Sequence, residues 1–327
     1  MGPLRLFFPL CFALAAQAQH PILIDTDAGT DDLMAIAFLA SQPSVRIDAI
    51  TVVNGLAHPD AGAKNIVRLL DLAGRKDIPV FAGRGTPLQG KAEFPAEWRK
   101  ISDDLPGVTL PASSRPPESK HAADYLIERL RDQTRPVRIL ALGPLTNLAE
   151  ALKREPSAAG AIEEIVIMGG AVRVPGNLGD GGVFKTNNTT AEWNIFVDPV
   201  AARMVFRFGV PIRLIPLDAT NKVPVDSVFL AKFQSGARSP LARVVAQVLE
   251  TDRAFIQAGF FYAWDPLAAV ALLHPAVVKT INLHIDIRQD PPEAGRTVQI
   301  AGRPNAQVAM DADGDAWRKL FLEALEK

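Results

Sequence analysis

Residues 21–36 read PILIDTDAGTDDLMAI, a short apolar run that ends in four carboxylates and passes at once into an apolar helical pattern. The run predicts a buried strand, Ala28-Gly29 predicts a tight turn, and Asp31 and Asp32 fall at the start of the next helix. Carboxylates this close raise one another's pKa unless a cation lies among them. Dense oxygen ligands on a strand-to-helix turn indicate a hard divalent cation, Ca²⁺ or Mg²⁺. The alternative interpretation is a solvated acidic turn with an ordinary helix cap.

Composition limits the classes of function that need to be considered. The chain has 327 residues, of which 48% are hydrophobic, and a formal net charge of -1. This length allows one large core or two small ones. The near-neutral charge gives no electrostatic signature for nucleic acid polymers or for an acidic membrane surface.

The N-terminal residues have the pattern of a secretory signal. Arg5 gives a short positive region, residues 6–16 are apolar, and Ala16-Gln17-Ala18 has the small-x-small form of a cleavage site. We therefore predict a cleaved signal peptide at residues 1–18, a single domain at residues 19–327, and a secreted or periplasmic location. The apolar run is too short for a stable membrane span, and the alternative is a buried N-terminal helix. Cys11 is the one cysteine, so the mature chain would have neither thiol catalysis nor cysteine metal ligands.

Further along the chain, apolar strand patterns alternate with helical ones. Two irregular excursions, residues 84–118 and 173–191, interrupt this alternation, and residues 277–310 predict strands and hairpin turns. Strands alternating with helices predict an α/β fold: one domain with a Rossmann-like open, mostly parallel sheet and helices on both faces. The helices are predicted at residues 32–40, 59–73, 121–131, 148–154, 198–208, 241–255, 266–273 and 316–326.

Several of the predicted strands end in polar or glycine-rich turns. Besides the acidic turn, these are Asn54-Gly55, residues 143–147 and Gly169-Gly170. In open parallel sheets, ligands bind outside the carboxyl ends of the strands. The turns are therefore expected to meet along one rim, where a polar ligand would bind beside the acidic turn.

These motifs, taken in order, resemble those of a known family. DTDAGTDD at residues 25–32 is similar to the N-terminal signature of the inosine–uridine nucleoside hydrolases. Later segments of the chain resemble further motifs of the family, in the same order. The matching later segments are ALGPLTNLA (141–149), MGG (168–170), GN (176–177), AEWNIFVDP (191–199) and WDPLA (264–268). The resemblance covers most of the chain. It implies the nucleoside hydrolase fold, Ca²⁺-dependent hydrolysis of the N-glycosidic bond of ribonucleosides to free base and ribose, and a homo-oligomer, either a dimer or a tetramer.

The resemblance also implies roles for individual residues. The metal ligands are Asp27, Asp32, the backbone carbonyl of Leu142, and Asp265. Asp27 is in addition the general base that activates water, while Asp25 supports the loop. The ribose-binding residues are Asp31, Asn54, Asn177, Glu192 and Asn194. The role of Asn54 has an alternative, because Gly55 aligns equally well with the polar residue that the family has at this place.

Two tryptophans bear on the preferred base. In the pyrimidine-accepting and nonspecific branch, His typically precedes the C-terminal Asp, whereas this chain has Trp264. Together with Trp98, this resembles the purine-preferring branch, in which aromatic residues stack on the base. Gly29 departs from that branch, which has Asn there. A purine preference is expected, with a nonspecific or pyrimidine nucleoside hydrolase as the alternative.

Other interpretations of the same residues remain. Asn147 and Asp198 are interpreted as helix caps. Asp25-x-Asp27 after a strand is also the nucleophile pattern of haloacid-dehalogenase-like phosphatases, although Gly29 stands where that motif has Thr or Val. A non-catalytic periplasmic nucleoside-binding protein is a third possibility, which the predicted single domain and the general base disfavour.

Overall fold

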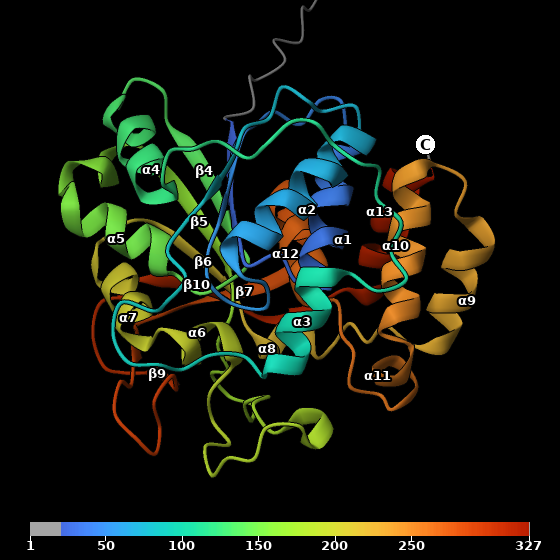
Figure 1. The fold of residues 1–327 in the computed structure, drawn as a ribbon. Coiled ribbons are helices and arrows are strands. Elements are labelled where there is room, and N and C mark those ends of the chain that lie inside the picture. Colours follow the sequence, from blue (N-terminus) through green and yellow to red (C-terminus); the bar gives the residue numbers. More distant parts are fainter. Residues whose placement is uncertain (1–20, 327) are drawn as a thin grey trace, which may run out of the picture.

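The computed structural model describes residues 21–326, so the predicted signal peptide and Cys11 lie outside the described residues. An eight-stranded sheet forms the centre of the molecule, and a separate two-stranded sheet lies beside it (Figure 1). The strands are β1 (Ile22–Thr26), β2 (Ile47–Val52), β3 (Val80–Ala82), β4 (Val137–Ala141), β5 (Ile162–Met168), β6 (Ile212–Ile215), β7 (Val278–Leu283), β8 (Ile285–Ile287), β9 (Thr297–Gln299) and β10 (Ala306–Ala312).

The order of the strands creates a switch point at the middle of the sheet. The order is β3-β2-β1-β4-β5-β6-β10-β7, and every neighbouring pair is parallel except β10 with β7. The chain proceeds from β1 to one edge, then returns to the far side of β1 with β4. Connections on the two sides of this point diverge, which leaves a crevice at the carboxyl ends of β1 and β4. The predicted Rossmann-like sheet is confirmed.

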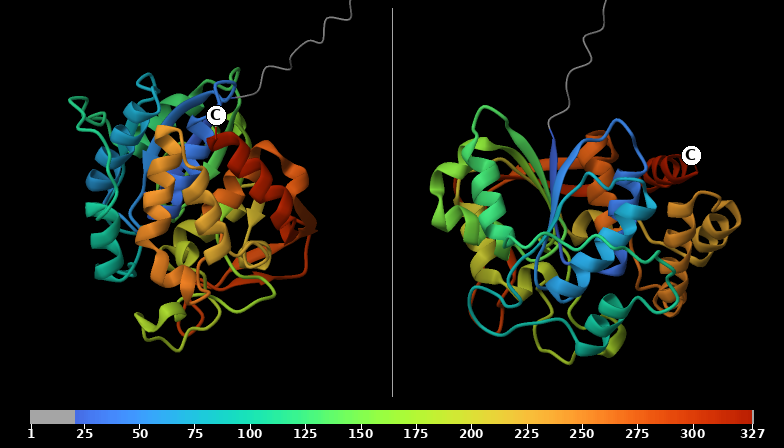
Figure 2. Two further views of the ribbon diagram at one scale, coloured as in Figure 1. Left: turned by 90° about the vertical axis from the view of Figure 1, so that its right-hand side faces the viewer. Right: turned by 45° about the horizontal axis from the view of Figure 1, so that its top comes forward.

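Helices cover both faces of the sheet (Figures 1 and 2). One face packs against α1, α2 and α12, behind which α10 packs on α1 and α2 and α13 packs on α1 and α12; the other face packs against α4, α5 and α7. The helices are α1 (Thr30–Ala40), α2 (Pro59–Leu72), α3 (Ala96–Asp104), α4 (Ala122–Arg131), α5 (Thr146–Arg154), α6 (Trp193–Val197), α7 (Pro199–Arg207), α8 (Leu217–Thr220), α9 (Ser227–Gly236), α10 (Pro240–Thr251), α11 (Arg253–Gln257), α12 (Trp264–Leu273) and α13 (Gly314–Leu325).

Helix α1 is buried along its whole length because α2, α10, α12 and α13 surround it. Its apolar composition on every side follows from this position, since a helix without a solvent face has no place for polar residues. The polar residues of α1 are confined to its first turn, at the carboxyl end of β1. Burial therefore fixes both the axis of α1 and the location of its acidic N-terminus.

One predicted helix is wrong in its extent. The apolar pattern of residues 241–255 predicts one helix, but the structure has two, α10 and α11, which meet at Asp252. Asp252 ends α10, its backbone N–H bonding the carbonyl of Val248. The break turns the chain toward the carboxyl ends of the strands, where α3, α6 and α11 lie (Figure 1). Within residues 21–326, no helix combines the length and the hydropathy needed to cross a membrane.

Candidate functional site

A cavity of about 310 Å³ opens at the switch point of the sheet. Its lining comes from the turns after β1, β2, β4 and β5 and from α3, α6, α11 and the start of α12. Ten of the eleven predicted site residues line it: Asp27, Asp31, Asp32, Trp98, Leu142, Asn177, Glu192, Asn194, Trp264 and Asp265. The fold thus brings together residues that are separated by more than two hundred positions in the sequence.

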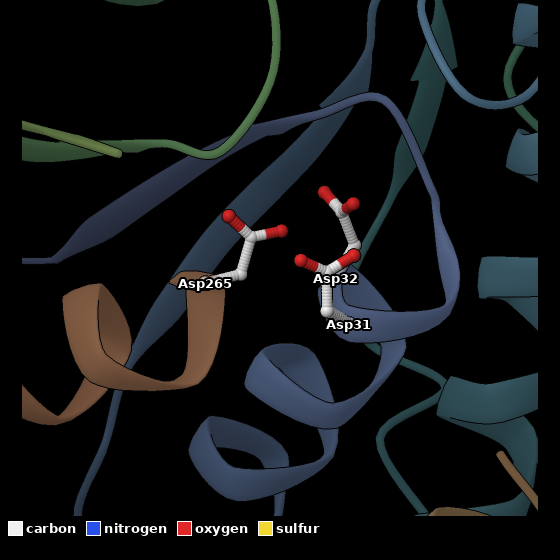
Figure 3. A group of neighbouring side chains, drawn as sticks. All are labelled: Asp31, Asp32 and Asp265. Carbon is white, nitrogen blue, oxygen red and sulfur yellow. The ribbon is translucent and has the colours of Figure 1, made fainter. Parts of the chain in front are cut away.

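Three carboxylates converge at the bottom of this site. One oxygen from each of Asp31, Asp32 and Asp265 can be chosen so that the three lie within 4.8 Å of one another, and all three residues are buried. Figure 3 shows the carboxylate of Asp265, on α12, facing those of Asp31 and Asp32, on α1. Both helices direct their N-terminal ends at the cluster, and the positive end of the helix dipole favours negative charge there. Two packed helices and their first turns therefore build the acidic site.

Asp27 lies beside this cluster and is not one of its three members. Its Oδ2 accepts a hydrogen bond of 2.9 Å from the backbone N–H of Leu56, and its carboxyl also hydrogen-bonds that of Asp32. Asp32 accepts further bonds from the Thr26 hydroxyl and, at 2.9 Å, from the backbone N–H of Gly29. These bonds hold the carboxyls of Asp27 and Asp32 side by side. The backbone N–H groups of Asp31 and Asp32 bond the carboxyl of Asp31, and the carboxyl of Asp265 hydrogen-bonds that of Asp32.

The ionisation of these groups indicates which kind of ligand suits the site. Burial, followed by repulsion from Asp32, raises the pKa of Asp27, Asp31 and Asp265 well above the usual value for aspartate. Burial also raises the pKa of Asp32. Carboxylates that repel one another in a buried site need a cation to ionise at neutral pH. The donors are all oxygen atoms, so they fit Ca²⁺ or Mg²⁺ rather than a soft metal.

Asp25 lies behind the cluster, on β1. Its Oδ1 accepts hydrogen bonds from the hydroxyl of Thr51 (2.6 Å) and from the side-chain amide of Asn147 (2.9 Å), and burial raises its pKa to about 7. Asn147 was expected to cap a helix, and this expectation is wrong: it is the second residue of α5, and its side chain reaches across to β1. The pairing of β1 with β4 explains the contact, because it places Asp25 opposite Ala141, just before α5. The predicted cap at Asp198 is confirmed, since its carboxylate accepts from the backbone N–H of Ala201.

Three of the residues expected to hold ribose, Asn177, Glu192 and Asn194, come from the loop after β5 and from α6. Glu192 caps α6 and accepts from three backbone N–H groups, among them that of Gly170 at 2.8 Å, while burial raises its pKa to about 6. The side-chain amide of Asn194 donates to the carbonyl of Leu142 at 2.9 Å. Asn177 accepts from the backbone N–H of Trp193 at 3.2 Å. Each polar side chain in this group is therefore fixed by a bond to the backbone, with further hydrogen-bonding capacity remaining.

Asn54 is the predicted site residue that does not line the cavity. Its Oδ1 accepts a bond of 2.8 Å from the guanidinium of buried Arg99, on α3, which also pairs with Glu93. The neighbouring Gly55 packs directly on Asp27, and a Cβ at this glycine would lie 2.0 Å from Asp27 Oδ2. The backbone of this turn is thus part of the site, whereas the Asn54 side chain is linked to α3.

The rest of the cavity is aromatic. Trp264 contacts Phe261 at a centroid distance of 5.2 Å. Trp98 packs edge-on against Trp193 (5.6 Å) and Phe255 (5.9 Å). Trp98 and Trp264 both line the cavity, as the sequence led us to expect, in a lining that is mainly apolar. Such a surface suits a flat heteroaromatic ring.

Sequence reasoning missed part of the lining. Asp180, Asp252, Phe255 and Phe260 all line the cavity, and none was identified beforehand. Asp252 and Phe255 fall within a stretch whose pattern predicts an uninterrupted helix, so no local signal distinguished them. Asp180 falls in an irregular excursion whose path depends on the folded chain.

Comparisons with known proteins agree with this geometry. The sequence profile of the family described as "Inosine-uridine preferring nucleoside hydrolase" matches residues 22–319. The pyrimidine-specific ribonucleoside hydrolase RihA of Salmonella schwarzengrund is 32% identical over 317 residues, covering 94% of this chain and 98% of the relative.

Solved structures resemble this one over a similar length. A plant nucleoside hydrolase, PpNRh1, superposes with a TM-score of 0.84 at 29% identity and covers 94% of this chain and 99% of its own. The purine-preferring ribonucleoside hydrolase of Gardnerella vaginalis gives 0.79 at 26% identity, covering 94% and 98%. The relatives therefore include proteins named for pyrimidine and for purine substrates.

Proposed function

The chain belongs to the inosine–uridine preferring nucleoside hydrolase family, whose members are N-ribohydrolases, and we propose that it is a Ca²⁺-dependent hydrolase with a preference for purine ribonucleosides. One observation carries the proposal: the buried carboxylate cluster and the aromatic lining belong to the same cavity. A carboxylate cluster suits a cation and a ribose, and an aromatic lining suits a base. A nucleoside presents both kinds of surface to a single site.

The chemistry assigns a task to each part of the acidic site. Asp27, Asp32, Asp265 and the carbonyl of Leu142 would hold Ca²⁺, which supplies positive charge that lowers the pKa of water and orients the ribose hydroxyls. Asp27 accepts a proton from the attacking water, whose oxygen forms a bond to C1′ as the C1′–N bond breaks. The leaving base takes the bonding electrons and a proton from solvent, and Asp27 later returns the proton it accepted to solvent, so that the protons balance over one turnover. The transition state has oxocarbenium character, as in other glycoside cleavages.

Other residues of the lining would fix the substrate during this step. Asp31, Asn177, Glu192 and Asn194 bind the ribose hydroxyls, and their backbone contacts keep them in place before the substrate arrives. Asp25 orients the acidic turn through its bonds to Thr51 and Asn147. Such preorganisation matters because small displacements of reacting groups slow a reaction strongly.

The preference for purines depends on Trp264, supported by Trp98. An indole provides a broad face for a two-ring base and stabilises positive charge on the base as it is protonated. The pyrimidine-specific relative, at 32% identity, favours the alternative of a pyrimidine or nonspecific enzyme. The substrate panel described next distinguishes these alternatives.

The test measures the ribose that the purified protein releases from inosine, adenosine, guanosine, uridine and cytidine, with Ca²⁺ or with EDTA. We expect release that EDTA abolishes, with higher kcat/KM for the purines. Faster cleavage of uridine and cytidine would refute the purine preference. Tight binding of nucleosides without release of ribose would instead identify a binding protein, and phosphate release from p-nitrophenyl phosphate would identify a phosphatase.

Trp264→Ala tests the role of the indole directly. We expect kcat/KM for inosine to fall about 10-fold or more, in line with the 1–3 kcal/mol typical of base–aromatic stacking. Trp264→Phe keeps an aromatic face and is expected to retain most of the rate. An unchanged rate for Trp264→Ala would show that this residue only packs against its neighbours.

Two further proposals concern the molecule as a whole. We propose export with cleavage after Ala18, and N-terminal sequencing of the mature protein is expected to begin at Gln19. We also propose a homo-oligomer, a dimer or a tetramer, which light scattering coupled to size-exclusion chromatography tests.

A further inference from the structure

Asp252 places a carboxyl group on the aromatic part of the cavity. It lies at the break between α10 and α11, three residues before Phe255, and lines the cavity together with Phe255 and Trp264. Its Oδ2 is buried and has no hydrogen-bond partner among the described residues. The side chain of Thr30, at the start of α1, hydrogen-bonds the same carboxyl group. The group is thus held in position while one oxygen remains without a donor.

The described side chains that line the cavity offer this oxygen no positive charge. Among the described residues that line it, there is no Lys, Arg or His. Burial raises the pKa of Asp252 to about 7. A buried polar atom without a partner is rare and costly, and in a ligand cavity its partner commonly comes from the ligand. The missing component is therefore a hydrogen-bond donor.

A nucleobase can supply that donor next to aromatic side chains. The expected ribose-binding groups Asn177, Glu192 and Asn194 belong to other loops of the cavity, whereas Asp31 lies near Asp252. The segment that carries Asp252 also places Phe255, Phe260 and Trp264 in the lining. A carboxylate accepts a bond from an exocyclic amino group, as it does from the amino group of cytosine in DNA recognition. A keto oxygen at the same place would face the carboxylate with two acceptors, and the donor of that edge would be the neighbouring ring N–H instead, N1–H in inosine and N3–H in uridine.

We propose that Asp252 is a specificity-determining residue that accepts a hydrogen bond from the exocyclic amino group of the base. It makes this enzyme favour amino-bearing nucleosides, adenosine and cytidine, over their keto counterparts, inosine and uridine. The proposal rests on the proposed nucleoside hydrolase function and adds to it the functional group by which the base is selected. Aromatic stacking sets the preference between ring sizes, and Asp252 sets the preference between amino and keto forms.

The test compares kcat/KM for matched pairs of nucleosides in Asp252→Ala and Asp252→Asn. We expect the adenosine-to-inosine ratio to fall about 10- to 100-fold in Asp252→Ala, the range for a lost hydrogen bond to a charged group. Purine riboside has neither an amino nor a keto group, and its kcat/KM should stay within about 2-fold of wild type. Asp252→Asn keeps the shape and one acceptor oxygen and is expected to lie between wild type and Asp252→Ala.

Asp180→Asn is the matched control, because Asp180 is another acidic residue of the lining. It is expected to change adenosine and inosine cleavage by the same factor. An unchanged adenosine-to-inosine ratio in both folded Asp252 variants would overturn the inference. So would an equal loss for adenosine, inosine and purine riboside, which would place Asp252 at the ribose or at ring nitrogen N7. If the wild-type protein releases ribose from no nucleoside, the proposed function fails, an outcome distinct from a change in selectivity.

Discussion

Two segments of the cavity lining, which meet where Thr30 bonds Asp252, use aspartate in different surroundings. The acidic turn, residues 25–32, holds its aspartates with bonds from neighbouring backbone and side-chain groups, such as those from Leu56 to Asp27 and from Gly29 to Asp32. The helix-break segment, residues 251–264, presents Asp252 with an unpartnered oxygen among aromatic rings. Both segments contain carboxyl groups whose pKa is raised by burial.

The difference shows how an aspartate's surroundings determine its partner. In the acidic turn, several carboxylates converge, so that only a cation can satisfy them together. In the helix-break segment, Asp252 is the one carboxyl of the lining. It is bonded by Thr30 and lies near Asp31, and one donor would satisfy its Oδ2. Under the proposed function, the first arrangement would bind a metal and ribose regardless of the base, and the second would respond to the base. Variants in the two segments should therefore separate the rate of cleavage from the choice of substrate.

The largest effect is expected from Asp27→Ala, in the acidic turn. Loss of a general base lowers rates about 10²- to 10⁴-fold, so ribose release from every nucleoside should fall by at least the lower figure. The ratio between adenosine and inosine should not change, because Asp27 acts on water. Stopped ribose assays measure both quantities, and circular dichroism checks the fold. Retained turnover would remove Asp27 from the mechanism.

A smaller effect is expected from Asn147→Ala, which removes the amide that donates to Asp25. Residues that orient metal ligands typically contribute about 10- to 100-fold. We expect a fall in kcat of about this size and a higher Ca²⁺ concentration for half-maximal activity. Asn305→Ala is the control, since Asn305 bonds the carbonyls of Phe206 and Ile285 outside the cavity. If both variants lose the same activity, the loss reflects general destabilisation.

The acidic turn also predicts how stability depends on pH when the metal is removed. Asp27, Asp31 and Asp265 have higher pKa values in the folded chain than the usual unfolded value of about 3.9. At a pH between the unfolded and the folded pKa, the folded state binds more protons than the unfolded state. The contribution of these groups to the free energy of unfolding is therefore greatest at low pH and is lost as the pH rises through the folded pKa. In EDTA, Tm should be lower at pH 8 than at pH 5.5 by about 3 °C or more.

Saturating Ca²⁺ should remove most of this fall in Tm, because the cation stabilises the ionised carboxylates. Differential scanning calorimetry at both pH values, with Ca²⁺ and with EDTA, makes the comparison. In EDTA at pH 8, Asp27→Ala should melt at a higher temperature than wild type, since it removes one repelling group. A Tm that rises from pH 5.5 to pH 8 in EDTA would contradict the ionisation described here.

The two segments also differ in how far the sequence predicted them. The acidic turn was predicted because its strand, turn and helix start are encoded by neighbouring residues. Its link to Asp265 followed from the resemblance of ordered motifs. The helix break at Asp252 was not predicted, because the apolar pattern continues across it. Contacts with Thr30 and Trp98, far away in the sequence, accompany the break in the folded chain.

Asn147 and Asn54 illustrate the same limit. Their positions, at a helix start and at a strand end, follow from local pattern. Their side-chain partners depend on which elements become neighbours: β1 beside β4 for Asn147, and α3 above the turn after β2 for Asn54. Local periodicity predicts the helices and strands and the buried face of each. A hydrogen bond between distant elements can be predicted only when the order of the strands and the placement of the helices are known.

The smallest effect is expected at the contact between the two segments, where Thr30 hydrogen-bonds Asp252. Thr30→Val keeps the branched shape at the start of α1 but removes the hydroxyl that bonds Asp252. Asp252 would remain present but less firmly held, so we expect the adenosine-to-inosine ratio of kcat/KM to fall about 2- to 5-fold, equivalent to roughly 0.4–1 kcal/mol. Thr30→Ser, which keeps the hydroxyl, should retain the wild-type ratio. A fall in the cleavage of both nucleosides without a change in their ratio would mean that Thr30 serves the acidic turn rather than Asp252.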